Sequence, residues 1–173
     1  EVRSEDSVRS VMGSITEPLD LLVNNAGISD GRWSSIDEID FEVVSNVLEV
    51  NAIAPVRVTQ RALPLLDRAG GGTVVMITSL MGSIEDCMSG KSYAYRASKT
   101  ALNMFTTSMK NELIERNISL LLIHPGWVET DMGGPRAPVS PEESVRGILE
   151  RIEEQTLATS GRFVEYTGRP LPW

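Results

Sequence analysis

The sequence predicts an α/β protein built on a doubly wound parallel sheet, and three observations support this fold class. Short, nearly continuous apolar runs alternate along the chain with longer segments whose apolar residues recur at helical spacing. Continuous rather than alternating hydrophobicity is typical of strands that are covered on both faces of a parallel sheet. Each of the first three runs ends in a turn that contains glycine and polar residues. Strands that alternate with helices indicate a parallel α/β sheet.

Four apolar runs are predicted to be strands. The first three are bulky and lie at 19–23, 73–77 and 118–123, and a weaker fourth run lies at 162–166. Three consecutive glycines at 70–72 form the turn that precedes the second strand.

Three longer segments are predicted to be helices. Residues 41–66 form a long helix in which Pro55 predicts a bend or a local break, because proline cannot donate the hydrogen bond of a helix interior. A second helix spans 95–115. The third spans 141–154 and begins with Ser140 as its N-cap.

Composition and charge narrow the classes of function. The 173 residues are 41% hydrophobic and carry a formal net charge of -8, and no linker divides them, so one domain over 1–173 is expected. An acidic chain without a basic stripe argues against nucleic acid as a partner. Cys87 is the single cysteine, so no intramolecular disulfide forms, and we interpret it as an exposed, inert thiol. No apolar run approaches the ~20 residues of a membrane-spanning helix.

The argument for chemistry starts from Tyr95 and Lys99. Residues four apart on a helix share a face, so the ammonium lies near the phenol. A free tyrosine has a pKa near 10, and a nearby positive charge lowers that pKa toward the range useful for proton exchange with an alcohol or carbonyl. Ser79, at the end of the neighbouring strand, can hydrogen-bond the same substrate oxygen. Taken alone, the pair is better explained as a surface tyrosine and a solvated lysine.

The pair stands within an ordered set of motifs. These are NNAG at 24–27, TSxxG at 78–82, YxxxK at 95–99 and HPGWVET at 124–130. Their order resembles the short-chain dehydrogenase/reductase superfamily from about residue 19 to residue 130. The resemblance implies a Rossmann-type fold and hydride transfer between NAD or NADP and a small-molecule carbonyl or alcohol.

The resemblance also implies roles for individual residues. Tyr95 is the general acid/base, Lys99 lowers its pKa and binds the nicotinamide ribose, and Ser79 polarises the substrate carbonyl. Asn51 matches an asparagine that perturbs its helix and holds a water in the proton relay, although without the family pattern it is better explained as a solvated helix asparagine. Besides Tyr95 and Lys99, the implied cofactor-binding residues are Asn24, Ala26, Gly27, Pro125, Gly126, Val128 and Thr130.

The position of the catalytic serine departs from the family pattern. In most members it lies thirteen residues before the tyrosine, whereas Ser79 lies sixteen and Ser83 twelve residues before Tyr95. We choose Ser79 because its Ser-x-x-Gly context places it at the end of a strand. The extra residues then fall in the loop at 84–92, where an insertion is tolerated, and Ser83 becomes a plain loop serine.

Within the superfamily, the sequence is similar to the C-factor and sniffer-type carbonyl reductases as far as the terminal LPW at 171–173. This likeness slightly favours NADP over NAD. It also implies that three strands, two helices and the glycine-rich pyrophosphate loop precede this part of the fold, and nothing in residues 1–20 resembles that loop. We therefore expect the catalytic half of a longer domain, which binds dinucleotide feebly by itself and associates through the bare edge of its first strand.

Two functions remain open, as do several details. The chain is part of a cytoplasmic NAD(P)-dependent oxidoreductase, or it is a truncated C-factor-like signalling or interaction protein, which would be associated with the cell surface.

Helices 41–66 and 95–115 are a candidate surface for a homodimer. His124 has no second histidine to pair with, so no metal site is predicted. Trp127 and Met132 form an apolar wall of the substrate site or pack within the protein.

Overall fold

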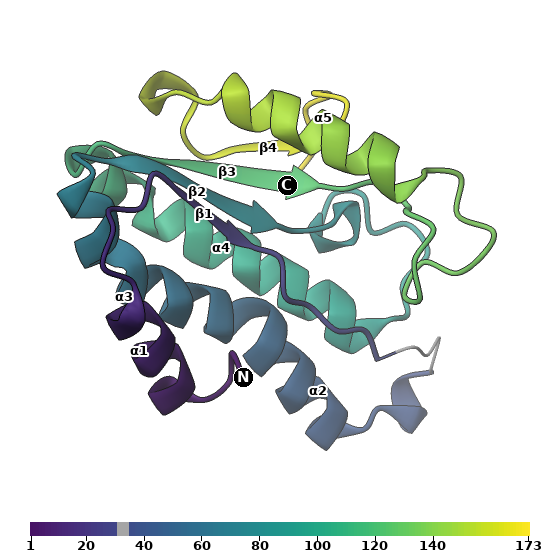
Figure 1. Cartoon of the computed structure of the whole chain (residues 1–173). Coiled ribbons are helices and arrows are strands. Elements are labelled where there is room, and N and C mark those ends of the chain that lie inside the picture. The colour runs from purple at the N-terminus through teal and green to yellow at the C-terminus, as the bar shows by residue number, and fades with distance from the viewer. Residues whose placement is uncertain (31–34) are drawn as a thin grey trace.

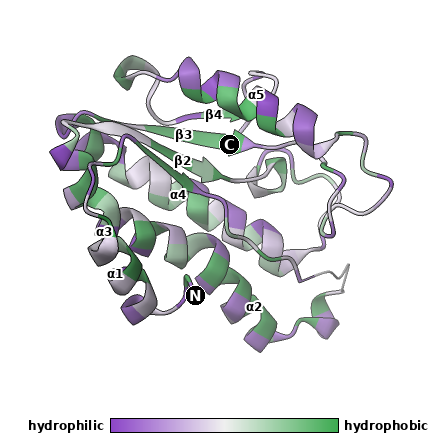
Figure 2. Cartoon of the chain, in the orientation of Figure 1, coloured by the Kyte–Doolittle hydropathy of each residue, from purple (hydrophilic) through white to green (hydrophobic). Residues whose placement is uncertain are grey.

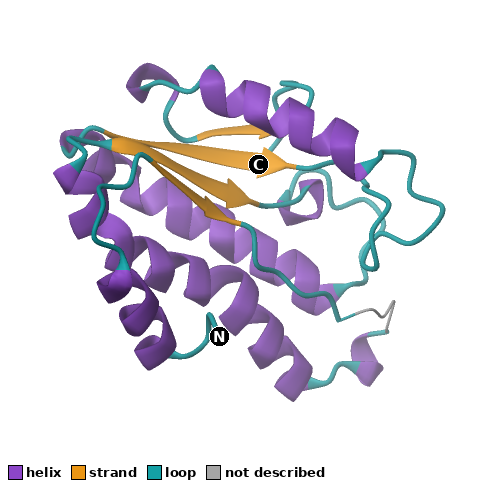
Figure 3. Cartoon of the chain, viewed as in Figure 1, coloured by secondary structure: helices purple, strands orange, loops and turns teal. Residues whose placement is uncertain are grey.

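The computed structural model describes residues 1–30 and 35–173, and it confirms an α/β fold with helices on both faces of a parallel sheet (Figures 1 and 3). All neighbouring strands are parallel and follow one another in chain order. The strands are β1 (Leu21–Asn24), β2 (Gly72–Ile77), β3 (Ile118–His124) and β4 (Arg162–Glu165).

Five α-helices accompany the strands in the described part of the chain. They are α1 (Glu5–Ser14), α2 (Phe41–Leu48), α3 (Ala54–Arg68), α4 (Tyr93–Glu115) and α5 (Pro141–Glu153). Ser140 caps α5 as predicted, since its Oγ accepts from the main-chain N–H of Glu143 at 3.1 Å. None of these helices combines the length and the apolar character that crossing a bilayer would require.

The two faces of the sheet carry separate apolar cores. Val74 and Met76 of β2 pack with residues of α3 and α4, including Leu66 and Leu102. Val75, which points the opposite way, packs with Leu121, Ile123 and Val164, and Ile148 and Ile152 of α5 cover that cluster. Figure 2 shows hydrophobic residues along β2 and β3, whereas the helices combine hydrophobic and hydrophilic residues. Burial on both faces explains why the strand sequences do not alternate.

The predicted helix at 41–66 is interrupted just before Pro55. Residues Glu49–Ile53 form a π-helical turn between α2 and α3, and Asn51 at its centre is fully buried. Pro55 lies in the first turn of α3, directly after the π-turn. Proline has no N–H to donate and crowds the carbonyl of the residue four positions earlier, which here is Asn51, so the irregularity falls within one turn of where the proline predicted it. Single π-turns inside helices are frequent at functional sites.

The connections between strands do not all cross the same face of the sheet. Helices α3 and α4 lie on one face, and α5 lies on the other (Figure 1). Because the strand order is sequential, a crossover over one face has the opposite hand to a crossover over the other. Parallel crossovers are almost always right-handed. The crossover through α5 differs in hand from the crossovers through α3 and α4, so one of these two kinds of crossover has the rare left hand.

Strand β1 forms one edge of the described sheet. Its side chains alternate, with Leu22 and Asn24 buried against α3, while Leu21 and Val23 on the other face are 37% and 42% exposed. The apolar cluster beneath α5 takes its members from β2, β3 and β4, so α5 does not extend over β1.

Candidate active site

Polar side chains gather where β1, β2 and β3 end. Because the strands are parallel, their carboxyl ends meet at one edge of the sheet, which is where ligands bind in folds of this class. Helix α4 begins at the same edge with Tyr93, two residues before the predicted start. This brings its first two turns, which carry Tyr95 and Lys99, against the end of β2.

Ser79 lies near enough to Tyr95 for its hydroxyl to lower the pKa of the phenol. Ser79 lies two residues after the end of β2 and caps the short 3-10 turn Leu80–Gly82, where its Oγ accepts from the N–H of Met81 at 3.1 Å. Gly82 lets this turn lie directly on α4, because a Cβ added there would be 2.9 Å from the Cβ of Lys99. The turn that carries Ser79 is therefore packed directly on the helix that carries Tyr95.

Lys99 lies beneath the tyrosine and is 4% exposed. Its Nζ is 5.7 Å from the centroid of the Tyr95 ring and donates a hydrogen bond to the carbonyl oxygen of Ile77 at 2.9 Å. Burial lowers the pKa of Lys99 to about 8. Near neutral pH the side chain is therefore mostly a cation, within a few ångströms of the phenol.

The pKa of Tyr95 differs from the expectation. Burial of the ring raises the pKa of the phenol, and the hydrogen bond with Ser79 lowers it by a smaller amount. Lys99 lies near the ring, but removal of the phenolate from water dominates in this site. In the chain alone, burial is therefore the largest influence on the phenol pKa, and the lowering by Lys99 stays a prediction.

Asn51 connects the elements of the site. Its side chain forms two hydrogen bonds with the main chain of Ile28, because Oδ1 accepts from the N–H and Nδ2 donates to the oxygen, both at 2.8 Å. Nδ2 also donates to the Oγ of Ser98 at 3.0 Å. The Ser98 hydroxyl in turn donates to the carbonyl oxygen of Tyr95 at 2.8 Å. The buried π-turn thus fixes both the loop after β1 and the first turn of α4.

The residue next to Lys99 on the β1 side is Gly27. A Cβ added to Gly27 would lie 3.4 Å from Asn51 Oδ1 and 3.6 Å from Lys99 Nζ. The glycine therefore leaves the ammonium open on this side, and only one of the three ammonium hydrogens is needed for the carbonyl of Ile77. This arrangement fits the ribose hydroxyls of a nicotinamide cofactor, which Lys99 is expected to bind.

The two serines have different surroundings. Ser83 is 2% exposed, and its Oγ donates to the main-chain oxygen of Trp173 at 3.1 Å and accepts from the N–H of Asp86 at 3.0 Å. Its hydroxyl is therefore used for structure, whereas that of Ser79 faces Tyr95. This geometry supports the choice of Ser79, and it shows that Ser83 is more than a plain loop serine.

The NNAG turn is only partly directed at the site. The Asn24 amide is buried and donates to Thr59 Oγ1 at 3.1 Å and to the sulfur of Met76 at 3.3 Å. It therefore holds the end of β1 on α3. Ala26 is exposed, and Gly27 faces Lys99 as described above.

The segment after β3 is tied to α5 and closes on itself. The Pro125 oxygen accepts from Ser144 Oγ at 2.6 Å, and Val128 pairs with Val139 in an isolated bridge. Two features require glycine at position 126. Its φ of +87° is a conformation that other residues rarely adopt, and a Cβ there would be 2.9 Å from the Tyr166 ring. A further residue of this segment, Thr130, is exposed and accepts from Gly133 N at 3.2 Å.

The remaining candidates lie around this edge. Burial lowers the pKa of His124 to about 4, so its imidazole is neutral. Among the described residues, no group of three or more possible ligands of the His, Cys, Asp and Glu types could hold a metal ion. Trp127 and Met132 are each 53% exposed, which places them outside the core, and Cys87 is exposed.

Two residues of this site were missed in the sequence. Ser98 links Asn51 to Tyr95, and its place next to Lys99 in the helix was the available signal. Trp173 holds Ser83 from ninety residues away, and no local pattern indicates such a contact.

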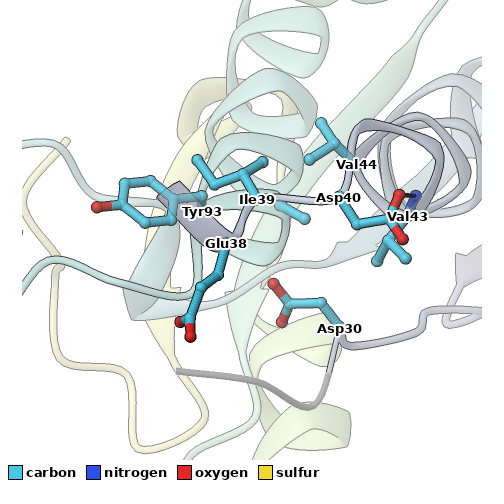
Figure 4. Close-up of a pocket in the computed structure, with 8 residues that line it drawn as sticks. Asp30, Glu38, Ile39, Asp40, Val43, Val44 and Tyr93 are labelled. Atoms are coloured by element: carbon cyan, nitrogen blue, oxygen red, sulfur yellow. Dashed lines mark hydrogen bonds between the residues drawn. The ribbon is translucent and has the colours of Figure 1, made fainter. Parts of the chain in front are cut away.

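A cavity of about 160 Å³ lies at the start of α4, where Tyr93 is one of its lining residues (Figure 4). It is formed by the loop after β1, the start of α2 and the first residues of α4. Its lining residues are Asp30, Glu38, Ile39, Asp40, Val43, Val44, Tyr93 and Ala94. Ser79, Tyr95 and Lys99 do not line it, so the cavity adjoins the site at the start of α4 and does not contain the catalytic residues.

Comparisons with known proteins agree with this geometry. A family model described as short chain dehydrogenase matches residues 1–139. The chain is 43% identical over 158 residues to C-signal of Myxococcus xanthus, which covers 91% of this chain and 95% of that protein. It superposes with TM-score 0.96 and 32% identity on the carbonyl reductase Sniffer of D. melanogaster, of which it covers 76%. An NADPH-bound carbonyl reductase from chicken fatty liver gives TM-score 0.93 and 34% identity, with 75% of that chain covered. The chain therefore belongs to the short-chain dehydrogenase family.

Proposed function

We propose that the protein is an NADP(H)-linked oxidoreductase that interconverts a small carbonyl compound and its alcohol. The observation that carries this proposal is the placement of Ser79 and the buried Lys99 around Tyr95, with Lys99 Nζ 5.7 Å from the centroid of the ring. Similarity to carbonyl reductase structures, one described as NADPH-bound, supports the cofactor and the reaction class. A bound nicotinamide dinucleotide would supply or accept the hydride.

The residues of the chain would supply the proton and position the carbonyl. Ser79 and Tyr95 both hydrogen-bond the substrate oxygen, and Tyr95 donates its proton to that oxygen as the alcohol forms. The phenol of Tyr95 is the group that supplies this proton, and burial of the ring raises its pKa. The cation of Lys99 then stabilises the phenolate that is left.

The supporting residues hold this geometry. Asn51 fixes the first turn of α4 through Ser98, and Gly27 leaves the ammonium of Lys99 accessible for ribose hydroxyls. We assign Pro125, Gly126, Val128 and Thr130 to the nicotinamide side of the site, and Asn24, Ala26 and Gly27 to its ribose side.

Replacement of Tyr95 by phenylalanine tests the proposal. Tyr95→Phe removes the transferable proton and keeps the ring over Lys99, so kcat/KM for NADPH-dependent carbonyl reduction should fall by about 10²- to 10⁴-fold. The affinity for NADPH, measured by fluorescence titration, should change little. Turnover equal to that of the unmodified protein would rule out the assigned role.

A second candidate function is supported by the match with C-signal, since the chain covers 95% of that protein. In that case the chain acts as a signalling or interaction protein without turnover. The same variant separates the two functions, because Tyr95→Phe should abolish reduction and leave partner binding or signalling intact.

A further inference from the structure

The C-terminal segment of the chain packs against the turn that carries Ser79. After β4 the chain turns at Gly168 and runs back along that strand, where the N–H of Leu171 donates to the oxygen of Phe163 at 3.0 Å. The buried side chains of Leu171 and Phe163 belong to one apolar cluster, and Leu80 packs against it. The residue that directly follows Ser79 therefore rests on the end of the chain.

Trp173 fastens the beginning of the loop between the 3-10 turn and α4. Its main-chain oxygen accepts from Ser83 Oγ at 3.1 Å and from the N–H of Glu85 at 2.9 Å. The Ser83 Oγ also accepts from the N–H of Asp86 at 3.0 Å, so one hydroxyl joins the tail to the loop. The Trp173 ring lies 5.4 Å from the ring of Phe163, which anchors the tail residue itself.

The other end of the loop is held from α4. Arg96 donates from Nε to the oxygen of Gly90 at 3.2 Å and from Nη2 to Ser89 Oγ at 3.0 Å. Between these two anchors, residues 84–89 are exposed. The loop joins the 3-10 turn that follows Ser79 to the start of α4, which carries Tyr95.

We propose that residues 170–173 act as a clamp on the loop at 83–92 and thereby shape the substrate side of the active site. Ser83 and Trp173 are positioning residues, which act through the loop and do not touch the reacting atoms. The inference about substrate rests on the proposed function, whereas the clamp itself does not. Lys99 and Gly27, on the cofactor side, make no contact with the tail among the described hydrogen bonds and clusters.

The test measures loop opening and substrate recognition separately in the full chain. Ser83→Ala removes the hydroxyl that joins loop and tail, so tryptic cleavage after the exposed Lys91, followed by mass spectrometry, should become about tenfold faster. With saturating NADPH, KM for the carbonyl substrate should rise about three- to tenfold, while kcat and the Kd for NADPH change less than about twofold.

Two further sets of variants serve as controls. Ser160→Ala removes another buried serine hydroxyl, which accepts from the N–H of Leu120 near the amino end of the sheet, and it should leave cleavage at Lys91 and KM unchanged. Trp173→Ala frees the tail from Phe163 and should act like Ser83→Ala, whereas Trp173→Phe keeps a ring and should restore the unmodified behaviour.

Each outcome bears on the proposal. Equal cleavage rates in Ser83→Ala and Ser160→Ala would overturn the clamp. Faster cleavage with an unchanged KM would overturn its role in substrate recognition. If the unmodified chain shows no turnover, the proposed function fails, and the cleavage rates alone then support or overturn the clamp.

Discussion

At the scale of single residues, Lys99 places a positive charge in the core, where burial destabilises the charged form of the side chain. The lysine is 4% exposed, and burial lowers its pKa to about 8. One hydrogen bond to Ile77 offsets part of the lost hydration. The proposed function gives this buried ammonium a purpose, because a cation with a single hydrogen bond to the protein could still bind a ribose hydroxyl or stabilise a phenolate.

The lowered pKa of Lys99 predicts a pH-dependent stability. A folded-state pKa of about 8 below the ordinary 10.5 means that the folded state binds the proton less tightly, so the buried charge destabilises the fold below about pH 8 and this effect disappears as the pH rises toward 10.5. The difference corresponds to at most about 3 kcal/mol. Lys99→Met should therefore gain stability relative to the unmodified chain near pH 7, and that gain should shrink near pH 10.

Urea unfolding at the two pH values measures this effect. The exposed Lys91 provides the control, because Lys91→Met should show no such change with pH. A stability difference for Lys99→Met that is the same at both pH values would contradict the prediction.

At the scale of elements, the site depends on the contact between the 3-10 turn at Leu80–Gly82 and α4. The contact is so close that a Cβ on Gly82 would be 2.9 Å from both the main-chain carbon and the Cβ of Lys99. The hydroxyl of Thr100 also donates to the Gly82 oxygen at 2.9 Å. The glycine thus sets the separation between Ser79 and the helix that carries Tyr95.

Gly82→Ala should therefore push the turn away from α4. We expect a loss of about 1–3 kcal/mol in the free energy of unfolding, together with a fall in kcat/KM, because Ser79 moves away from Tyr95. Gly13→Ala is the matched control, since no atom lies within 4 Å of a Cβ at that position of α1. This control should be neutral or stabilising by up to about 1 kcal/mol. Thermal unfolding and steady-state kinetics measure both effects, and an active Gly82→Ala variant of unchanged stability would refute the argument.

At the scale of the whole molecule, two exposed apolar surfaces are candidates for self-association. Leu21 and Val23 of β1 are 37% and 42% exposed on the face that α5 leaves uncovered, at an edge strand. On α4, Phe105 is 44% exposed, within the helix expected to contribute to a homodimer. Apolar side chains at a strand edge favour pairing with another chain.

We predict that residues 1–173 by themselves associate through β1. Light scattering during size-exclusion chromatography should show dimers or larger species, and Val23→Lys should shift them toward monomer, because a charge on the edge strand opposes pairing. Phe105→Glu should have the smaller effect. The reverse order of the two variants would instead support the homodimer through helices 41–66 and 95–115.

The sequence by itself determined the fold class, because the alternation of strands and helices is a local pattern. Continuous apolar runs identified β2 and β3 as strands covered on both faces, whereas the candidate site residues, including the choice of Ser79 over Ser83, came from the resemblance of an ordered set of motifs and stay predictions. The spacing of Tyr95 and Lys99 placed them on one helix face, since helical geometry depends only on residue separation.

Only the tertiary structure decided how these parts are held together. The π-turn before Pro55 buries Asn51, whose side chain forms hydrogen bonds with Ile28 and Ser98. The net pKa of Tyr95 depends on burial, which no spacing reveals. The placement of α5 on the opposite face, and the contact of Trp173 with Ser83, join segments distant in the chain. Local periodicity encodes which face of an element is apolar, but the partner of that face depends on packing and desolvation across the whole molecule.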